Sequence, residues 1–80
     1  MRIRVRYYAS FRDMTGKVEE WLEVPEGITV LGIRDHVRGL YDKIAGKDQV
    51  LVAVNGSFTA LDRVIAEGDD VAFFPPVSGG

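Results

Sequence analysis

The sequence predicts an α+β domain in which one main helix packs on a mixed sheet of about five strands. Apolar and charged residues alternate at the start of the chain, as in a half-buried strand. A central segment instead repeats apolar residues every three or four positions, as in a helix with one buried face. Short β-prone segments follow toward the end of the chain. The expected order of elements is therefore β-β-α-β-β-β.

The first two strands are expected at residues 2–8 and 17–24. The inward face of the first strand would hold Ile3, Val5 and Tyr7. Residues 9–15 break the alternation, and Gly16 indicates a turn or an irregular connection. Because this connection is short, we expect the two strands to form an antiparallel hairpin. Trp21 falls on the outward face of the second strand.

The main helix is expected between Thr29 and Gly46. The Thr29 hydroxyl can accept a hydrogen bond from a free backbone N–H of the first turn, and Gly46 can end the helix. The apolar positions of the buried stripe are Val30, Ile33, Val37, Leu40 and Ile44. Gly32 and Gly39 weaken the helix, so packing against the sheet must compensate.

The remaining elements are expected to be strands at residues 50–54, 57–59 and 71–74, with a loop or a turn of helix at 61–66. Asn55-Gly56 favours a tight hairpin turn, because both residues tolerate positive φ. Pro75 and Pro76 end the last strand, since proline cannot donate to the ladder. We therefore expect one domain at residues 1–74 and an extended tail at residues 75–80.

Composition argues against most side-chain chemistry. The chain has no cysteine, which excludes disulfides, cysteine-ligated zinc and a cysteine nucleophile. His36 is the only histidine, so no metal site is expected, and the adjacent acids Glu19-Glu20 and Asp69-Asp70 do not converge on one proton. We assign Asp69-Asp70 a turn-forming role. A net charge of -2 and the absence of a long apolar run predict no nucleic-acid or membrane partner, and a cytoplasmic location.

The end of the chain offers the remaining reactive group, the terminal carboxylate of Gly80. Pro75 and Pro76 favour an extended exit from the domain, which continues through Val77 and Ser78. Gly79 and Gly80 have no Cβ atom, so they can thread a channel too narrow for side chains. Because the chain has no thiol, any sulfur that it carries must be held at this terminus, as a thiocarboxylate formed after adenylation.

The last eight residues, Phe73-Phe74-Pro75-Pro76-Val77-Ser78-Gly79-Gly80, resemble the ending of the molybdopterin synthase small subunit family. The resemblance runs along the whole chain. Its other matching segments are residues 7–9, residues 11–13 with Gly16, residues 53–55 and residues 68–72. The family resemblance implies a ubiquitin-like β-grasp fold, which agrees with the element order above.

The resemblance also implies a mechanism. An E1-like adenylating enzyme would use ATP and Mg²⁺ to activate Gly80, and a sulfur donor protein would then form the thiocarboxylate. The tail would enter the large subunit of molybdopterin synthase and transfer sulfur to cyclic pyranopterin monophosphate, in a heterotetramer with a small subunit at each end. The chain itself would bind no cofactor and would not be an enzyme on its own.

A docking surface follows from the implied fold. In a β-grasp sheet the first and last strands are neighbours, and alternation turns Tyr8 and Phe74 away from the core. Phe58 matches an apolar family position on the short strand. We therefore expect Tyr8, Phe58 and Phe74 to form an exposed patch that binds the large subunit and the adenylating enzyme.

Two other interpretations remain open from the sequence. A ubiquitin-like modifier, or a sulfur carrier for thiamine thiazole or tRNA thiolation, would use the same activated Gly-Gly end with a different acceptor. A passive β-grasp binding module would use no covalent chemistry, and deletion of Gly80 would then leave its function intact.

Overall fold

The alternating start of the chain forms β1 (Arg2–Tyr7) in the computed structural model, which describes residues 1–47 and 49–76. It pairs antiparallel with β2 (Glu19–Glu23), which confirms the expected hairpin. The inward residues of β1 are fully buried, as predicted, and Trp21 of β2 lies outward with 59% of its surface exposed. Alternation alone was thus sufficient to place both faces of the hairpin.

The connection between β1 and β2 is a short helix, α1 (Ser10–Thr15), which the sequence analysis did not predict. Ala9 precedes it with φ 52° and ψ −132°, and the Phe11 N–H donates to the Tyr8 carbonyl oxygen at 3.0 Å. These values match the first central position of a type II′ turn, which normally holds glycine. Gly16, with φ 73°, ends the helix in the left-handed conformation. The segment is too short for periodicity to reveal it.

The central apolar stripe forms α2 (Val30–Leu40) and then a separate turn of helix, α3 (Asp42–Ala45). Thr29 caps α2 as predicted, since its Oγ1 accepts a hydrogen bond from the Gly32 N–H at 3.1 Å. The prediction of one continuous helix was wrong at Tyr41, which is extended with φ −131° and ψ 108°. Leu40, the last residue of α2, was expected in the buried stripe but is 50% exposed.

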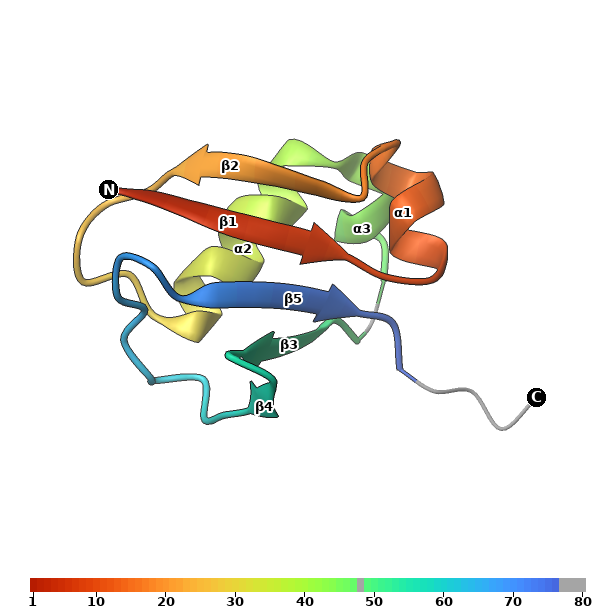
Figure 1. The fold of residues 1–80 in the computed structure, drawn as a ribbon. Helices are drawn as coiled ribbons and strands as arrows, with labels where there is room; N and C mark the ends of the chain where they lie inside the picture. The colour runs from red at the N-terminus through yellow and green to blue at the C-terminus, as the bar shows by residue number, and fades with distance from the viewer. Residues whose placement is uncertain (48, 77–80) are drawn as a thin grey trace.

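The second half of the chain supplies β3 (Leu51–Val54), β4 (Ser57–Phe58) and β5 (Asp70–Phe74). Asn55 and Gly56 take φ values of 52° and 83° in the turn between β3 and β4, as expected. The sheet has the order β2-β1-β5-β3-β4, with β1 and β5 parallel and the other neighbours antiparallel (Figure 1). The mixed sheet and its main helix confirm the predicted β-grasp fold.

Residues 61–66 contain no helix and form a loop that supports the start of α2. The Val30 N–H donates to the Arg63 carbonyl oxygen, and the Leu31 N–H donates to the Leu61 carbonyl oxygen, both at 2.9 Å. These bonds satisfy two of the N–H groups that a helix leaves free at its N-terminus. The loop thus fixes the position of α2 relative to β4.

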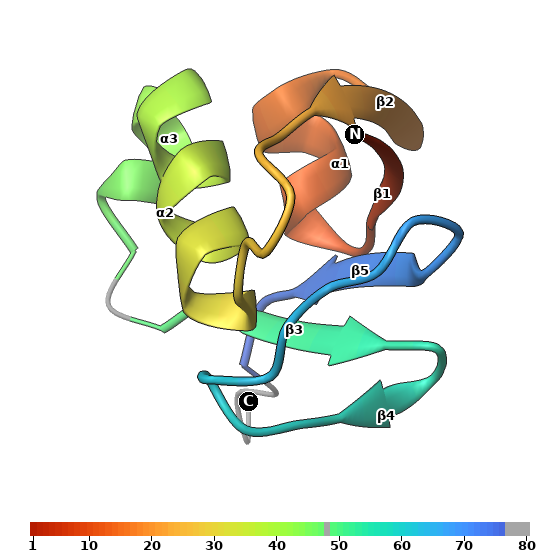
Figure 2. The same ribbon diagram turned by 90° about the vertical axis from the view of Figure 1, so that its left-hand side faces the viewer.

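One face of the sheet carries the core and the other is open. Figure 2 shows α2 and α3 on the same side of the sheet. Buried residues of β1, β3 and β5 form one core cluster with those of α2 and α3. The largest fully buried side chains are Tyr7, Phe11, Phe73, Ile3, Ile33, Ile44 and Ile65. Because the helices cover only this face, the opposite face remains accessible to partners.

A polar cluster joins the β1–β2 hairpin to the break between α2 and α3. Glu20 accepts hydrogen bonds from the Tyr7 hydroxyl at 2.7 Å, from the Lys17 ammonium at 3.2 Å and from the Tyr41 hydroxyl. Burial would raise the pKa of Glu20, but these hydrogen bonds outweigh it and hold that pKa below its usual value. The same contact explains why Tyr41 leaves the helix: its hydroxyl bonds to a carboxylate of the hairpin.

Replacing Ala9 with glycine should stabilise the domain. Ala9 has a positive φ that costs about 1–3 kcal/mol in a residue with a Cβ atom, whereas glycine adopts it without strain. Glycine also raises the conformational entropy of the unfolded chain, which offsets part of this gain. We therefore expect a net increase of about 1 kcal/mol in the free energy of unfolding, measured with urea. Gly16→Ala, at φ 73°, is the opposite control and should lose about 1 kcal/mol. An unchanged or lower stability of A9G would contradict the assigned strain.

Replacing Glu20 with glutamine should destabilise the domain by about 2 kcal/mol at neutral pH, because hydrogen bonds to a carboxylate are lost. Since the folded pKa of Glu20 is lowered, its contribution is present above the unfolded pKa of about 4.3 and is lost as pH falls through the folded value. The stability difference between wild type and E20Q should therefore shrink in acid. Glu23→Gln, at a carboxylate with a 74% exposed side chain, should change stability by less than about 0.5 kcal/mol. A difference for E20Q that does not vary with pH would refute this role.

Candidate functional site

Two aromatic rings stack on the open face because β1 and β5 are parallel neighbours. Tyr7 lies opposite Phe73, and both point into the core. The next residue of each strand, Tyr8 and Phe74, therefore points to the open face. The Tyr8 N–H donates to the Phe73 carbonyl oxygen at 3.1 Å, which extends the pairing past the end of β1. The two rings are stacked with centroids 4.6 Å apart and planes at 10°.

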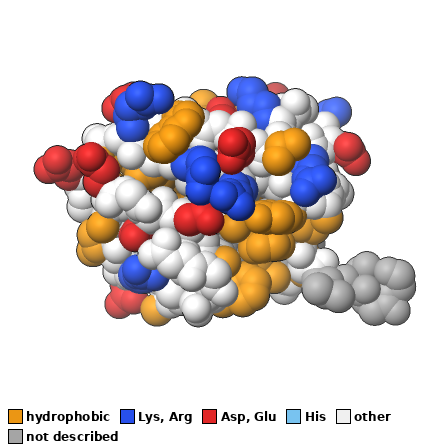
Figure 3. Space-filling model, in the orientation of Figure 1, with side chains coloured by type: hydrophobic (Ala, Val, Ile, Leu, Met, Phe, Trp, Pro, Cys, Tyr) orange, Lys and Arg blue, Asp and Glu red, His pale blue; other side chains and the backbone are white. Residues whose placement is uncertain are grey.

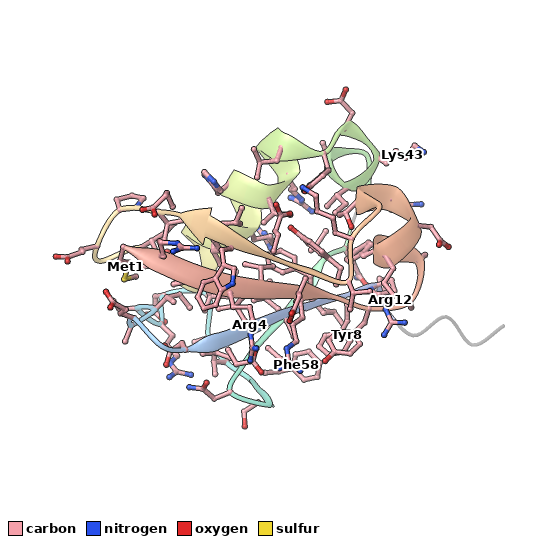
Figure 4. All side chains as sticks on the ribbon, turned by 45° about the horizontal axis from the view of Figure 1, so that its top comes forward. Met1, Arg4, Tyr8, Arg12, Lys43 and Phe58 are labelled. Carbon is pink, nitrogen blue, oxygen red and sulfur yellow. The ribbon has the colours of Figure 1, made fainter. Side chains whose placement is uncertain are left out.

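Phe58 joins this pair from the short strand β4. Its ring meets Phe74 edge-on at 5.8 Å, and 65% of its surface is exposed. In Figure 4, Phe58 and Tyr8 point toward the same region of the open face, beside Arg4. We call Tyr8, Phe58 and Phe74 the aromatic patch. The predicted meeting of these three rings is confirmed, but only Phe58 is exposed, since Tyr8 and Phe74 are half-buried. Their role in binding a partner stays a prediction.

The floor of the aromatic patch consists of residues that the sequence analysis did not single out. Leu51 of β3 pairs with Phe74, and Ala53 pairs with Phe58. Leu51 is 36% exposed, and Ala53 is buried although it lies on the open face. The available signal was alternation, since Leu51 lies between the inward residues Val50 and Val52. Figure 3 shows the resulting group of hydrophobic side chains next to a band of charged ones.

The charged band follows β1 and borders the aromatic patch. Arg6 lies 3.3 Å from the Asp70 carboxylate and 3.8 Å from that of Glu19, and Arg4 lies within 3.9 Å of both acids. The Tyr8 phenol, followed by the Asp70 carboxylate, raises the pKa of Arg6. Such partly exposed pairs contribute little to stability. They place charges of both signs at the rim, where charges govern the orientation and selection of a partner.

The tail begins at the edge of the aromatic patch. Phe74 ends β5. Of the next two residues, Pro75 is half-buried and Pro76 is exposed. The other predicted tail residues, Val77, Ser78, Gly79 and Gly80, lie outside the described residues. Their proposed threading and chemistry therefore rest on the sequence, whereas the structure shows where the tail starts.

The predicted turn-forming role of the acidic pair is confirmed for Asp69 and wrong for Asp70, which begins β5. The Asp69 carboxylate accepts hydrogen bonds from the Ala66 N–H at 2.8 Å and from the Asn55 side chain at 2.9 Å. The Ala66 bond, followed by the Asn55 bond, lowers the pKa of Asp69. The Asp70 N–H donates to Asn55 Oδ1 at 2.9 Å. Hydrogen bonds therefore link the turn after β3 to the turn before β5. These contacts explain Asp69 as part of a turn and give it no catalytic geometry.

No alternative site is formed by metal-binding side chains in the described part of the chain. No group of three His, Asp or Glu residues is suitably arranged for a metal ion there, and His36 is exposed on α2. None of the described helices is both long and apolar enough to span a bilayer. The aromatic patch at the root of the tail thus remains the main candidate site.

Comparison with known proteins identifies the family. The ThiS family matches residues 5–80. The chain belongs to this family. It is 36% identical over 83 residues to the molybdopterin synthase sulfur carrier subunit of Escherichia coli, with 98% of this chain and 99% of that protein covered. This match confirms the resemblance to the molybdopterin synthase small subunit family that the sequence indicated.

Solved structures support the same assignment of fold. A Pyrococcus furiosus protein provisionally described as molybdopterin converting factor subunit 1 aligns with a TM-score of 0.88 and 32% identity, covering 95% of this chain and 98% of that one. SAMP1 from Haloferax volcanii aligns with a TM-score of 0.84 and 27% identity over 100% of both chains. The ThiS-family β-grasp body is therefore shared with proteins described both as molybdopterin factors and as archaeal modifiers.

Proposed function

We propose that this chain is the sulfur-carrying small subunit of a molybdopterin synthase and acts in molybdenum cofactor biosynthesis. The observation that carries the proposal is the parallel pairing of β1 and β5, which places the aromatic patch at the root of a tail ending in Gly79-Gly80. The full-length match to a sulfur carrier subunit supports it. The folded body is the part that partners bind, and the terminus is the part that reacts.

The proposed chemistry occurs on the carboxylate of Gly80. An E1-like partner uses ATP and Mg²⁺, and the carboxylate attacks the α-phosphate to give an acyl-adenylate and pyrophosphate. Sulfide supplied by a sulfur donor protein then attacks the acyl carbon, AMP leaves, and a thiocarboxylate remains. Its sulfur attacks a carbon of cyclic pyranopterin monophosphate in the large subunit, and an oxygen substituent leaves that carbon. Water then cleaves the acyl C–S bond, which leaves the sulfur on the substrate and restores the Gly80 carboxylate. The acyl carbon is unhindered because glycine has no side chain.

Within this cycle the aromatic patch provides a reusable docking surface. Exposed apolar groups of this kind, bordered by charged residues, mark partner-binding surfaces. The large subunit and the adenylating enzyme would both cover Tyr8, Phe58 and Phe74, so they would bind in turn rather than together. We propose a heterotetramer with the large subunit, a cytoplasmic location, and no nucleic-acid or membrane partner. The chain is not an enzyme on its own in this proposal, and ATP and Mg²⁺ belong to the adenylating partner.

The sequence also left open protein modification, and SAMP1 shares the same β-grasp body, but the full-length match to a sulfur carrier subunit favours the carrier function. In a modifier the activated Gly80 would form an isopeptide bond with a lysine of another protein instead of accepting sulfur. Denaturing gels of cell extracts distinguish the two functions, because only a modifier produces covalent adducts of high mass. Carriers for thiazole or tRNA thiolation share the thiocarboxylate and differ only in the acceptor.

Deleting Gly80 should abolish sulfur transfer, because the reacting acyl group is displaced by one residue. Mass spectrometry of the full chain after incubation with the adenylating enzyme, ATP and sulfide should show one oxygen replaced by sulfur. The shortened chain should show no such shift while giving the same circular dichroism spectrum as the full chain. A shortened chain that still supports cofactor synthesis at the normal rate would favour a passive binding module.

Replacing Phe74 with aspartate should weaken binding to the large subunit by a factor of about 30 or more, since a charge replaces a central aromatic contact. Calorimetric titration measures this affinity. F58D is a second test at a more exposed ring, in case F74D disturbs the fold. Val18→Asp introduces the same charge at a 59% exposed apolar residue outside the aromatic patch and should bind normally. Equal affinities for all four proteins would remove the docking role of the patch.

A further inference from the structure

A pocket of about 370 Å³ opens along the outer edge of β3, next to the aromatic patch. It is lined by Val50 and the first two residues of β3, by Val30 and Arg34 of α2, and by Phe58, Thr59 and Leu61. β4 is only two residues long, and in Figure 2 the chain after it leaves β3 and passes below the start of α2 before it reaches β5. Because Phe58 belongs to both features, the pocket and the aromatic patch form one continuous surface.

The outer edge of β3 reaches this pocket beyond the end of β4. The Asn55 N–H donates to the Asp70 carbonyl oxygen of β5 at 2.8 Å. In an antiparallel pair every second residue directs its backbone groups to the same neighbour, so those of Val52 point away from β5 and toward β4. β4 ends at Phe58, one residue before the position opposite Val52, so no strand residue of the described ranges pairs with Val52 on that side. The Val52 N–H therefore lies where a ligand in the pocket could accept a hydrogen bond from it.

Two side chains of the lining also carry unsatisfied polar atoms. Arg34 Nε and Thr59 Oγ1 are shielded from solvent and have no hydrogen-bond partner in the described part of the chain. The nearest carboxylate to Arg34 is that of Asp35, at 3.8 Å and with 62% of its side chain exposed. Arg38 Nε also has no partner among the described residues but lies outside the pocket. Arg34 Nε and Thr59 Oγ1 both belong to the pocket lining, so one ligand could bind both atoms.

We propose that this pocket receives an acidic side chain, best matched by glutamate, from the protein that docks on the aromatic patch. The inference rests on the proposed function only in naming that protein as the large subunit. Leu51, Phe58 and Leu61 provide apolar contacts for the methylene groups of such a side chain. A guanidinium, a hydroxyl and the Val52 N–H are donors for its carboxylate, and Arg34 repels a basic residue.

A protein is a better occupant than a free carboxylate metabolite because of where the pocket opens. Leu51 and Phe58 line the pocket and also belong to the open face at the aromatic patch. A partner that covers the patch therefore also covers this opening and excludes water from the contact. Exclusion of water strengthens a charge-assisted hydrogen bond to Arg34.

The test compares the affinity of the large subunit for wild type, R34Q and R38Q by calorimetric titration. R34Q removes the guanidinium from the pocket, and we expect about tenfold weaker binding because a hydrogen bond to a charged group is lost. R38Q makes the same change one turn along α2 at a residue that does not line the pocket, and it should bind as wild type does. Equal losses of affinity for R34Q and R38Q would show that binding depends only on the net charge of α2, which would overturn the inference.

Thr59→Val is the second variant, since it keeps the shape and removes only the hydroxyl. We expect T59V to raise the thermal unfolding midpoint of the free chain and to weaken binding, because the hydroxyl has a partner only in the complex. Amide NMR shifts of Val50 and Val52 should change when the complex forms with wild type and change less with R34Q.

Failure of the pocket and failure of the proposed function give different results. If F74D loses binding while R34Q and T59V retain it, the pocket inference is wrong and the docking role of the patch remains. If wild type does not bind the large subunit at all, the proposed function is wrong and this inference is overturned with it. Normal binding by R34Q with unchanged Val50 and Val52 shifts would also overturn the inference.

Discussion

The parallel pairing of β1 and β5 is the constraint on which the rest of the molecule depends. It joins the first strand to the last at the centre of the sheet and buries Tyr7 and Phe73 together, with ring centroids 5.9 Å apart. The same register turns the following two rings to the opposite face, where they stack. A parallel pair needs a long crossover, and here all the intervening elements provide it, with α2 carrying the chain from β2 across the covered face to the β3 side of the sheet. Core, docking surface and root of the tail therefore follow from one register.

The two faces of the sheet have different roles: one stabilises the domain, and the other carries the proposed docking surface. The covered face holds the hydrophobic core and includes the Glu20 cluster, whose hydrogen bonds link the β1–β2 hairpin to Tyr41. The open face carries the three rings of the aromatic patch, bordered by ion pairs. These partly exposed ion pairs contribute little to stability. A domain this small has no volume for a deep active site. Its surface and its terminus are therefore the parts available for function.

Sequence reasoning predicted whatever depends on local alternation or on a specific turn. It placed both faces of β1, the Thr29 cap, the Asn55-Gly56 turn and the meeting of Tyr8 with Phe74. It missed α1, because six residues show no measurable period, and it missed the break at Tyr41. That break depends on a hydrogen bond to Glu20, 21 residues away in the chain, which no local pattern encodes. The pocket at β3 was equally hidden, since it depends on where the chain after β4 departs from the sheet.

A carrier that passes between enzymes must bind each of them specifically and still dissociate. Three rings on an open face provide a contact that several partners can share, because apolar contacts carry little directional information. Directional groups discriminate more strongly, since a buried donor without its acceptor is costly. The Arg34 pocket adds such groups beside the shared rings, and neither Arg34 Nε nor Thr59 Oγ1 has a hydrogen-bond partner within residues 1–47 and 49–76. A partner with a matching carboxylate would gain affinity that others lack, so a shared docking surface can still distinguish the final acceptor from the enzyme that activates the tail.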